Sequence, residues 1–145
     1  PWPWADTWPV ARLTTPAGKT LYVLESTSGE ALAFGPGRLA GGIGSDQALT
    51  LAGHRDTHFA FLETLNPGQP LAVQLADGSQ QHFQISRQQV INSQHHPLHI
   101  PRDDQQLILI TCYPFGALTP GGPLRYVVTA TSAPTSNTAN NQAEQ

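Results

Sequence analysis

The chain has 145 residues, a formal net charge of −3 and an isoelectric point near 6.0. This length is sufficient for one domain with a sizeable hydrophobic core and too short for two ordinary ones. The seven Lys and Arg residues are scattered rather than gathered into a basic stripe, which argues against nucleic acid as a partner. A single Cys excludes an internal disulfide, so the chain is not a disulfide-stapled scaffold.

The first nine residues are rich in tryptophan and proline, with Trp2, Trp4 and Trp8 close together. Because the prolines exclude a regular helix, we expect residues 1–9 to form an extended arm. This arm either packs on the body or forms an aromatic belt at a membrane surface. The chain starts at Pro1 and contains no Met, so we expect that an upstream signal peptide or membrane anchor has been removed.

From Thr20 onward the sequence is typical of a β protein, because short β-rich runs alternate with Gly, Pro, Asn and Asp. The expected strands are TLYVLE (20–25), ALTLAG (48–53), LAVQLA (71–76), HFQIS (82–86), QVI (89–91), LILIT (107–111) and LRYVVTA (124–130). The LILIT and YVV runs are apolar without alternation, so we expect them in central strands that are covered on both faces.

The segments between these strands carry turn signals and one short helical pattern. Asp77-Gly78 predicts a two-residue hairpin turn after LAVQLA. The spacing of Phe59, Leu62 and Leu65 predicts one or two helical turns. The glycine-rich segment 34–47 lacks the GK[ST] ending of a phosphate-binding loop and predicts turns instead. Residues 134–145 offer no large apolar side chain to bury, which predicts a disordered polar tail.

Three residues stand where strands are expected to begin or end and could act together in acyl transfer. Cys112 ends an apolar run just before Tyr113-Pro114, which predicts a thiol at the rim of a sheet. A cysteine nucleophile needs a base or cationic partner, and His54 follows an expected strand and a glycine. Arg125 opens the last strand, and its guanidinium suits a developing oxyanion. Considered one by one, Cys112 could be buried filler and Arg125 a solvated edge residue.

The strings AGHRDTHFAFL, LITCYPF and GGPLRYVV, in this order and spacing, resemble the sortases, most closely their Gram-negative group. The resemblance runs from about Trp8 to Ala130. It implies an all-β fold, a closed sortase-type β-barrel of about eight strands with one or two short helical turns, over residues 10–133. It also implies that His54, Cys112 and Arg125 are the catalytic residues.

The same resemblance implies a cysteine transpeptidase. Such an enzyme cleaves an LPXTG-like C-terminal sorting signal of an exported protein through a thioester and transfers the product to an amine acceptor. Thr111, Tyr113 and His58 are the candidate substrate-binding residues. The expected location is the inner membrane, with the catalytic domain facing the periplasm and held by an N-terminal anchor that this chain lacks.

Two other functions remain open at the level of the residues. The first is a zinc site, because His54 and His58 are four residues apart and His95, His96 and His99 cluster downstream. The HExxH glutamate is missing, and the glycine before His54 indicates a strand end rather than a helix, so we expect no metal and no cofactor. The second is a non-catalytic β-barrel module that binds a peptide or another ligand, with Cys112 as buried filler.

Overall fold

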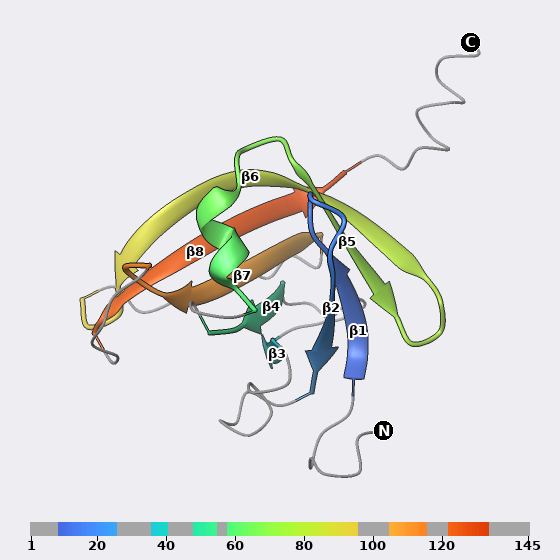
Figure 1. The fold of residues 1–145 in the computed structure, drawn as a ribbon, viewed down its shortest axis with the longest axis horizontal. Coiled ribbons are helices and arrows are strands. Elements are labelled where there is room, and N and C mark those ends of the chain that lie inside the picture. The colour runs from blue at the N-terminus through green and yellow to red at the C-terminus, as the bar shows by residue number, and fades with distance from the viewer. Residues whose placement is uncertain are drawn as a thin grey trace.

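Eight strands and one short 3-10 helix make up the part of the chain that the structure, a computed structural model, describes (Figure 1). The described residues are 9–25, 36–40, 48–54, 58–95, 105–115 and 122–133. The elements are β1 (Pro9–Thr14), β2 (Thr20–Leu24), β3 (Gly37–Ala40), β4 (Leu49–Ala52), η1 (Ala60–Thr64), β5 (Pro70–Leu75), β6 (Gln80–Asn92), β7 (Gln106–Cys112) and β8 (Leu124–Ser132). The strands close into a barrel in the order β1-β2-β3-β4-β7-β8-β6-β5, which confirms the predicted fold class.

The strand prediction needs three corrections. The runs HFQIS and QVI are not separate, because they belong to β6, which runs on through a register shift between Ile85 and Arg87. The glycine-rich segment expected to be turns contributes β3, which pairs with β4 and, through Leu24 and Gly37, with β2. Strand structure also begins before Thr20, since β1 starts at Pro9. Of the arm predicted over residues 1–9, Pro9 belongs to β1 and residues 1–8 lie outside the described residues, as does the tail predicted over residues 134–145.

The inward-facing side chains of the strands fill the barrel with one apolar core. Leu107 and Leu109 of β7 are fully buried there, together with Val128 and Ala130 of β8. The outer face of the same two strands is covered as well, because Ile108, Ile110 and Val127 form a second buried cluster with Ala48. Burial on both faces explains why LILIT and YVV do not alternate, and β7 does lie centrally, between β4 and β8.

The predicted hairpin joins β5 to β6, but its loop has three residues rather than two. The Leu75 N–H donates to the Ser79 carbonyl at 2.9 Å, and the Gly78 N–H donates to the Leu75 carbonyl at 3.0 Å. Gly78 has a φ of +90°, the left-handed conformation that glycine adopts without steric cost. A turn followed by a left-handed glycine is the usual three-residue connection, so Ala76 is part of the loop.

The helix η1 lies against the barrel through the residues whose spacing predicted it. Phe59, Leu62 and Leu65 are all buried, and they belong to the same core cluster as the inward side chains of β7 and β8. The Leu62 N–H donates to the Phe59 carbonyl at 3.2 Å, as the short repeat of a 3-10 helix requires. Among the described residues, no helix has the length and apolar character needed to cross a membrane.

Candidate active site

Strand register brings His54, Cys112 and Arg125 to one end of three neighbouring strands. β4 pairs in parallel with β7, with Ala52 beside Ile110. The Gly53 N–H extends this ladder by donating to the Ile110 carbonyl at 3.3 Å. His54 comes two residues after Ala52, just as Cys112 comes two residues after Ile110. In the antiparallel pair β7–β8, Cys112 lies directly opposite Arg125. Adjacent strands lie about 4.8 Å apart. Cys112 is therefore the middle residue of a row across the three strand ends, between His54 and Arg125.

The three side chains differ in exposure in a way that suits an accessible site. Cys112, the last residue of β7, is half-buried, as is Arg125, whereas His54 is exposed. Successive side chains alternate across a strand, so Cys112 shares the outer face of β7 with Ile108 and Ile110. The sulfur therefore stands at the end of the second apolar cluster and outside the barrel core.

Thr111, predicted to bind substrate, is buried inside the barrel with 3% of its surface exposed. Its hydroxyl donates to the Gly53 carbonyl at 2.7 Å, although the two residues are 58 positions apart in the chain. This bond ties the end of β7 to the residue that precedes His54. The contact indicates that Thr111 positions the Cys112 and His54 strands relative to each other.

Gly53 is held close to the aromatic ring of Phe59, a contact that the sequence did not reveal. A Cβ atom added at Gly53 would lie 2.9 Å from Phe59 Cγ, closer than real Cβ contacts come. The Phe59 N–H also donates to the carbonyl of His54 at 3.0 Å. The glycine before His54 is thus required by packing. The hydrogen bond from Phe59, the residue just before η1, fixes the backbone of His54.

The guanidinium of Arg125 is anchored to the backbone at the start of β8. Its Nη1 donates to the carbonyls of Gly122 at 2.7 Å and Leu124 at 2.9 Å. A guanidinium has five N–H donors in a rigid fork, so these bonds fix its plane without using all of them. No residue in the described ranges accepts a hydrogen bond from Nε or Nη2. Those donors can serve a developing negative charge on a bound substrate.

An aromatic cluster follows the thiol along the chain. Tyr113 stacks on Tyr126 of β8 with ring centroids 5.8 Å apart and planes 14° apart. Phe115 meets both rings edge to face, at 5.9 Å from Tyr113 and 5.2 Å from Tyr126. The Tyr113 N–H donates to the Leu124 carbonyl at 3.1 Å, which holds the segment after β7 to the start of β8. These rings border a cavity of about 270 Å³, so Tyr113, a predicted substrate-binding residue, lines a hollow, but Cys112 is not among the residues that line it.

The remaining histidines do not gather into a metal site within the described ranges. His58, the third predicted substrate-binding residue, is half-buried just before η1, whereas His82 lies on β6 and His95 follows its end. His96 and His99 fall outside the described residues. The described part of the chain holds no group of three or more His, Cys, Asp or Glu residues placed to bind a metal ion.

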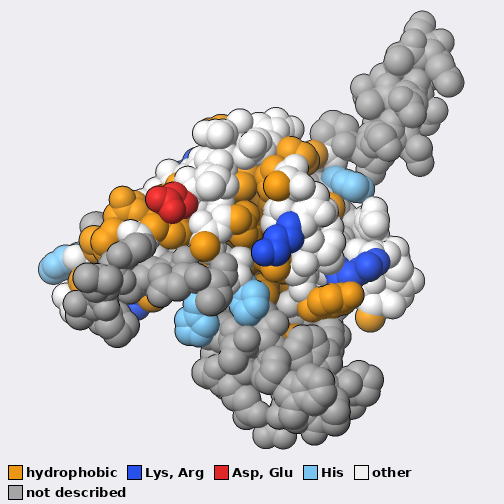
Figure 2. Space-filling view, viewed as in Figure 1, with side chains coloured by type: hydrophobic (Ala, Val, Ile, Leu, Met, Phe, Trp, Pro, Cys, Tyr) orange, Lys and Arg blue, Asp and Glu red, His pale blue; other side chains and the backbone are white. Residues whose placement is uncertain are grey.

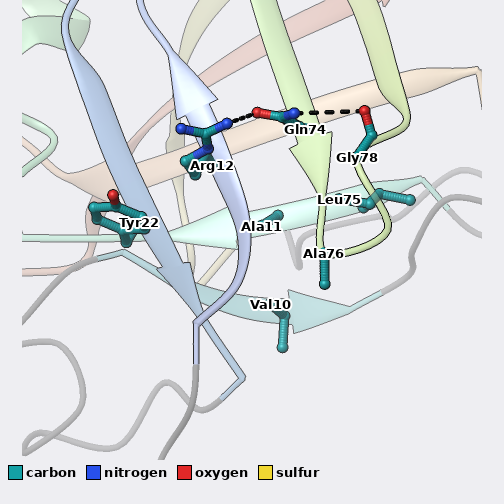
Figure 3. Close-up of a pocket in the computed structure, with 8 residues that line it drawn as sticks. All are labelled: Val10, Ala11, Arg12, Tyr22, Gln74, Leu75, Ala76 and Gly78. Atoms are coloured by element: carbon teal, nitrogen blue, oxygen red, sulfur yellow. Dashed lines mark hydrogen bonds between the residues drawn. The ribbon is translucent and has the colours of Figure 1, made fainter. Parts of the chain in front are cut away.

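A separate hollow of about 260 Å³ lies over β1, β2 and the β5–β6 turn (Figure 3). Arg12 points toward Gln74 there and donates a hydrogen bond from Nη2 to its Oε1 atom. Gln74 in turn donates to the Gly78 carbonyl at 3.4 Å. The lining side chains include neither a thiol nor an imidazole, so this hollow lacks the pair of groups that the candidate active site offers.

The chain belongs to the sortase family, because the model of the sortase domain matches residues 14–133. Its fold is similar to that of sortase A from Corynebacterium diphtheriae, with a TM-score of 0.79 and 21% sequence identity, covering 95% of this chain and 66% of that one. Sortase C-1 from Actinomyces oris is similar with a TM-score of 0.68 and 25% identity, covering 88% and 76%. Sortase C1 from Streptococcus agalactiae gives a TM-score of 0.72 at 18% identity, covering 88% and 70%. A search of curated proteins finds no match.

Proposed function

We propose that this chain is a cysteine transpeptidase of the sortase type, closest to the Gram-negative group. It cleaves an LPXTG-like C-terminal sorting signal of an exported protein and transfers the new carboxyl end to an amine. The observation that carries the proposal is the row formed at the strand ends, in which Cys112 pairs with Arg125 and lies beside the strand that leads to His54. Membership of the sortase family supports the same reaction class.

In the first half of the reaction His54 takes the thiol proton, and the Cys112 thiolate attacks the carbonyl carbon of the scissile peptide bond. A C–S bond forms, and the carbonyl oxygen becomes an oxyanion. Arg125 donates hydrogen bonds to that oxygen from the part of its fork that is not anchored to backbone. The C–N bond then breaks, and His54 gives its proton to the departing amine. A thioester on Cys112 remains.

The second half of the reaction reverses these roles. The acceptor amine attacks the thioester carbonyl, which again forms an oxyanion opposite Arg125. The neutral imidazole of His54 takes the proton that the new C–N bond releases. As the C–S bond breaks, the thiolate is regenerated, so no oxidant, reductant or metal enters the balance. Water in place of the amine gives hydrolysis.

The proposed setting is the periplasmic side of the inner membrane, with the catalytic domain held by an N-terminal anchor. The partners are the exported protein that carries the sorting signal and the molecule that supplies the amine. These parts of the proposal rest on the sequence motifs and their likeness to the Gram-negative sortases. Expression of the full-length protein followed by membrane fractionation and protease protection tests them.

The reaction is tested by thiol labelling in the presence and absence of peptide. We expect an alkylating reagent to modify Cys112 rapidly in the folded protein, an LPXTG peptide to slow the modification, and Cys112→Ala to abolish cleavage of that peptide. Slow labelling of folded protein, with no cleavage of any peptide in an LPXTG-type library, would favour the binding module instead. Circular dichroism of Cys112→Ala controls for loss of the barrel.

A further inference from the structure

The two carbonyls that anchor Arg125 belong to the start of β8 and to the segment just before it. The Leu124 carbonyl is fixed by the barrel, because it also accepts the Tyr113 N–H at 3.1 Å. The Gly122 carbonyl, which accepts the bond from Arg125 at 2.7 Å, lies before the first residue of β8. The ladder between β6 and β8 ends at the pair of Asn92 with Leu124 and does not reach Gly122. One anchor of Arg125 therefore depends on what holds the chain ahead of β8.

Ser93 holds that segment with two hydrogen bonds to one carbonyl. Its N–H donates to the Pro123 carbonyl at 2.9 Å, and its hydroxyl donates to the same oxygen at 2.8 Å. The two residues are 30 positions apart in the chain. Pro123 stands between Gly122 and Leu124, so the carbonyl that Ser93 holds lies between the two carbonyls that anchor Arg125.

The hydroxyl of Ser93 replaces a bond that proline cannot make. In an antiparallel ladder, the two residues of a hydrogen-bonded pair exchange two N–H···O bonds. Ser93 and Pro123 come one step after the last pair of β6 and β8, and Ser93 donates its N–H as such a pair requires. Pro123 has no N–H to return. The side chain of Ser93 supplies the second bond, so Ser93→Ala leaves only one.

The turn after β6 keeps Ser93 in place. Asn92 Oδ1 accepts the N–H of Gln94 at 2.9 Å, and the Asn92 carbonyl accepts the N–H of His95 at 3.1 Å. An asparagine side chain that bonds to the backbone two residues on is a common way to close a turn. Ser93 itself is exposed, and exposed backbone at the end of a strand opens more readily than the core. A second bond to Pro123 therefore has its largest effect at this place.

The placement of Arg125 matters because the row of His54, Cys112 and Arg125 contains one guanidinium. The described Lys and Arg side chains that Figure 2 shows stand apart from one another rather than in a patch. Donors that stabilise an oxyanion lie about 2.7–3.1 Å from the position of the developing charge. A shift of about 1 Å can cost on the order of a hundredfold in rate. A loose anchor for Arg125 would therefore slow the reaction even with all three residues present.

We propose that Ser93 is a positioning residue for Arg125. Through the Pro123 carbonyl it fixes residues 122–124, and this segment holds the guanidinium by Nη1 so that Nε and Nη2 face the oxyanion. The inference rests on the proposed transpeptidase function. It adds a residue that acts on the reaction only through Arg125.

The anchoring can be measured without any reaction, by NMR of the Arg125 guanidinium. Its signals are those missing from Arg125→Lys, and the two carbonyl acceptors should slow rotation about the Nε–Cζ bond. We expect this rotation to be about fivefold faster in Ser93→Ala, the effect of one net hydrogen bond, and to return to the wild-type rate in Ser93→Thr, which keeps the hydroxyl. Ser86→Ala is the matched control, because the Ser86 hydroxyl also joins β6 to β8, at the Thr129 carbonyl at 3.0 Å. Unchanged rotation in Ser93→Ala, or an equal change in Ser86→Ala, would overturn the proposal.

The kinetics of thioester formation test the consequence for the reaction. With an LPXTG peptide, Ser93→Ala should lower kcat about fivefold and leave KM unchanged. Alkylation of Cys112 by a small reagent should keep its rate, because it builds no oxyanion. In the Arg125→Ala background, Ser93→Ala should have no further effect, because the two residues act through one set of contacts. An equal loss in both backgrounds, or a wild-type kcat in Ser93→Ala, refutes the positioning role. Absence of any thioester in the wild type refutes the proposed function, and the rotation measurement then decides the anchoring.

Discussion

The β5–β6 turn and the candidate active site are both ends of strands, but they are built in opposite ways. At the turn, the Asp77 carboxylate accepts hydrogen bonds from the Ser79 N–H at 2.9 Å and its hydroxyl at 2.6 Å, so the contacts are local. At the candidate site, the Thr111 hydroxyl reaches Gly53 across 58 positions of the chain. The turn is specified by its own few residues, whereas the site depends on the register of separate strands.

This difference predicts where a small change has a large effect. A turn whose hydrogen-bond donors and acceptors lie within a few residues can lose one of these bonds without moving the rest of the barrel. The proposed nucleophile, base and oxyanion donor lie at or just beyond the ends of three different strands. An error in any one strand displaces reacting groups, and a misplacement of about 1 Å can cost on the order of a hundredfold in rate.

Arg125→Ala should have the largest effect among the variants that keep the nucleophile. We expect peptide cleavage to slow about a hundredfold or more, the size of the loss when an oxyanion donor is removed. Alkylation of Cys112 by a small reagent builds no oxyanion, so its rate should stay nearly the same. Steady-state cleavage and alkylation kinetics on the same preparation measure the two effects.

His54→Ala is the matched contrast, because it removes the residue proposed to generate the thiolate and to protonate the amine. Both cleavage and alkylation should slow in this variant. If Arg125→Ala cleaves at the wild-type rate, or slows alkylation as much as His54→Ala does, the division of roles between the two residues is wrong.

Gly53→Ala should damage both stability and activity, because the new Cβ would approach Phe59 Cγ to 2.9 Å. Overpacking of this kind costs about 1–3 kcal/mol in the free energy of unfolding. The displaced backbone carries His54, so cleavage should fall about tenfold or more. Urea unfolding and peptide cleavage measure the two losses. Gly122→Ala, whose Cβ would meet open space, should unfold like the wild type, and an equal loss there would remove the packing explanation.

Thr111→Val should have a smaller effect, because it removes one hydroxyl and keeps the shape of the side chain. Loss of the bond to the Gly53 carbonyl should cost about 1 kcal/mol of stability and lower the cleavage rate several-fold. Thr50→Val is the control, since within the described part of the chain its buried hydroxyl bonds only to the nearby Ala48 carbonyl, at 3.1 Å. Denaturation should detect a loss of stability in both variants. A cleavage rate reduced equally in both would show that Thr111 has no special role in positioning.

Asp77→Ala should have the smallest effect and should leave activity at neutral pH unchanged. Hydrogen bonds from Ser79 to the carboxylate hold the pKa of Asp77 below its usual 3.8. A lowered pKa in the folded state adds stability above the unfolded pKa, and this stability is lost as the pH falls through the folded pKa. Denaturation midpoints of wild type and variant should therefore differ at pH 7 and converge in acid. A difference between the two midpoints that grows as the pH falls would contradict the predicted direction of the pH dependence.

The sequence predicted the local features of this fold better than the long-range ones. Asp77-Gly78 marked its hairpin, and the spacing of Phe59, Leu62 and Leu65 marked η1, because both signals lie within a few residues. The strand β3 was missed because its glycine-rich residues pair through distant partners in β2 and β4. The positioning bond of Thr111 was missed for the same reason.

At the candidate site, too, the local features were predicted from the sequence and the long-range ones were not. The motifs around His54, Cys112 and Arg125 selected these residues from the sequence, and each lies at or just beyond a strand end. The aromatic cavity with Glu63 was not predicted, because η1, the segment that follows β7, and β8 contribute to it from three separate parts of the chain. Only Tyr113 of its lining was singled out from the motif.

The central claim is that Cys112 is the nucleophile, flanked by the His54 and Arg125 strands. Its most direct test is to mix the protein with an LPXTG peptide library, quench in acid and map the covalent adduct by mass spectrometry. We expect an acyl adduct on Cys112 that hydroxylamine removes, as it removes a thioester, and that is absent in Cys112→Ala. A hydroxylamine-resistant adduct, an adduct on any other residue, or peptide cleavage that persists in Cys112→Ala would contradict the account.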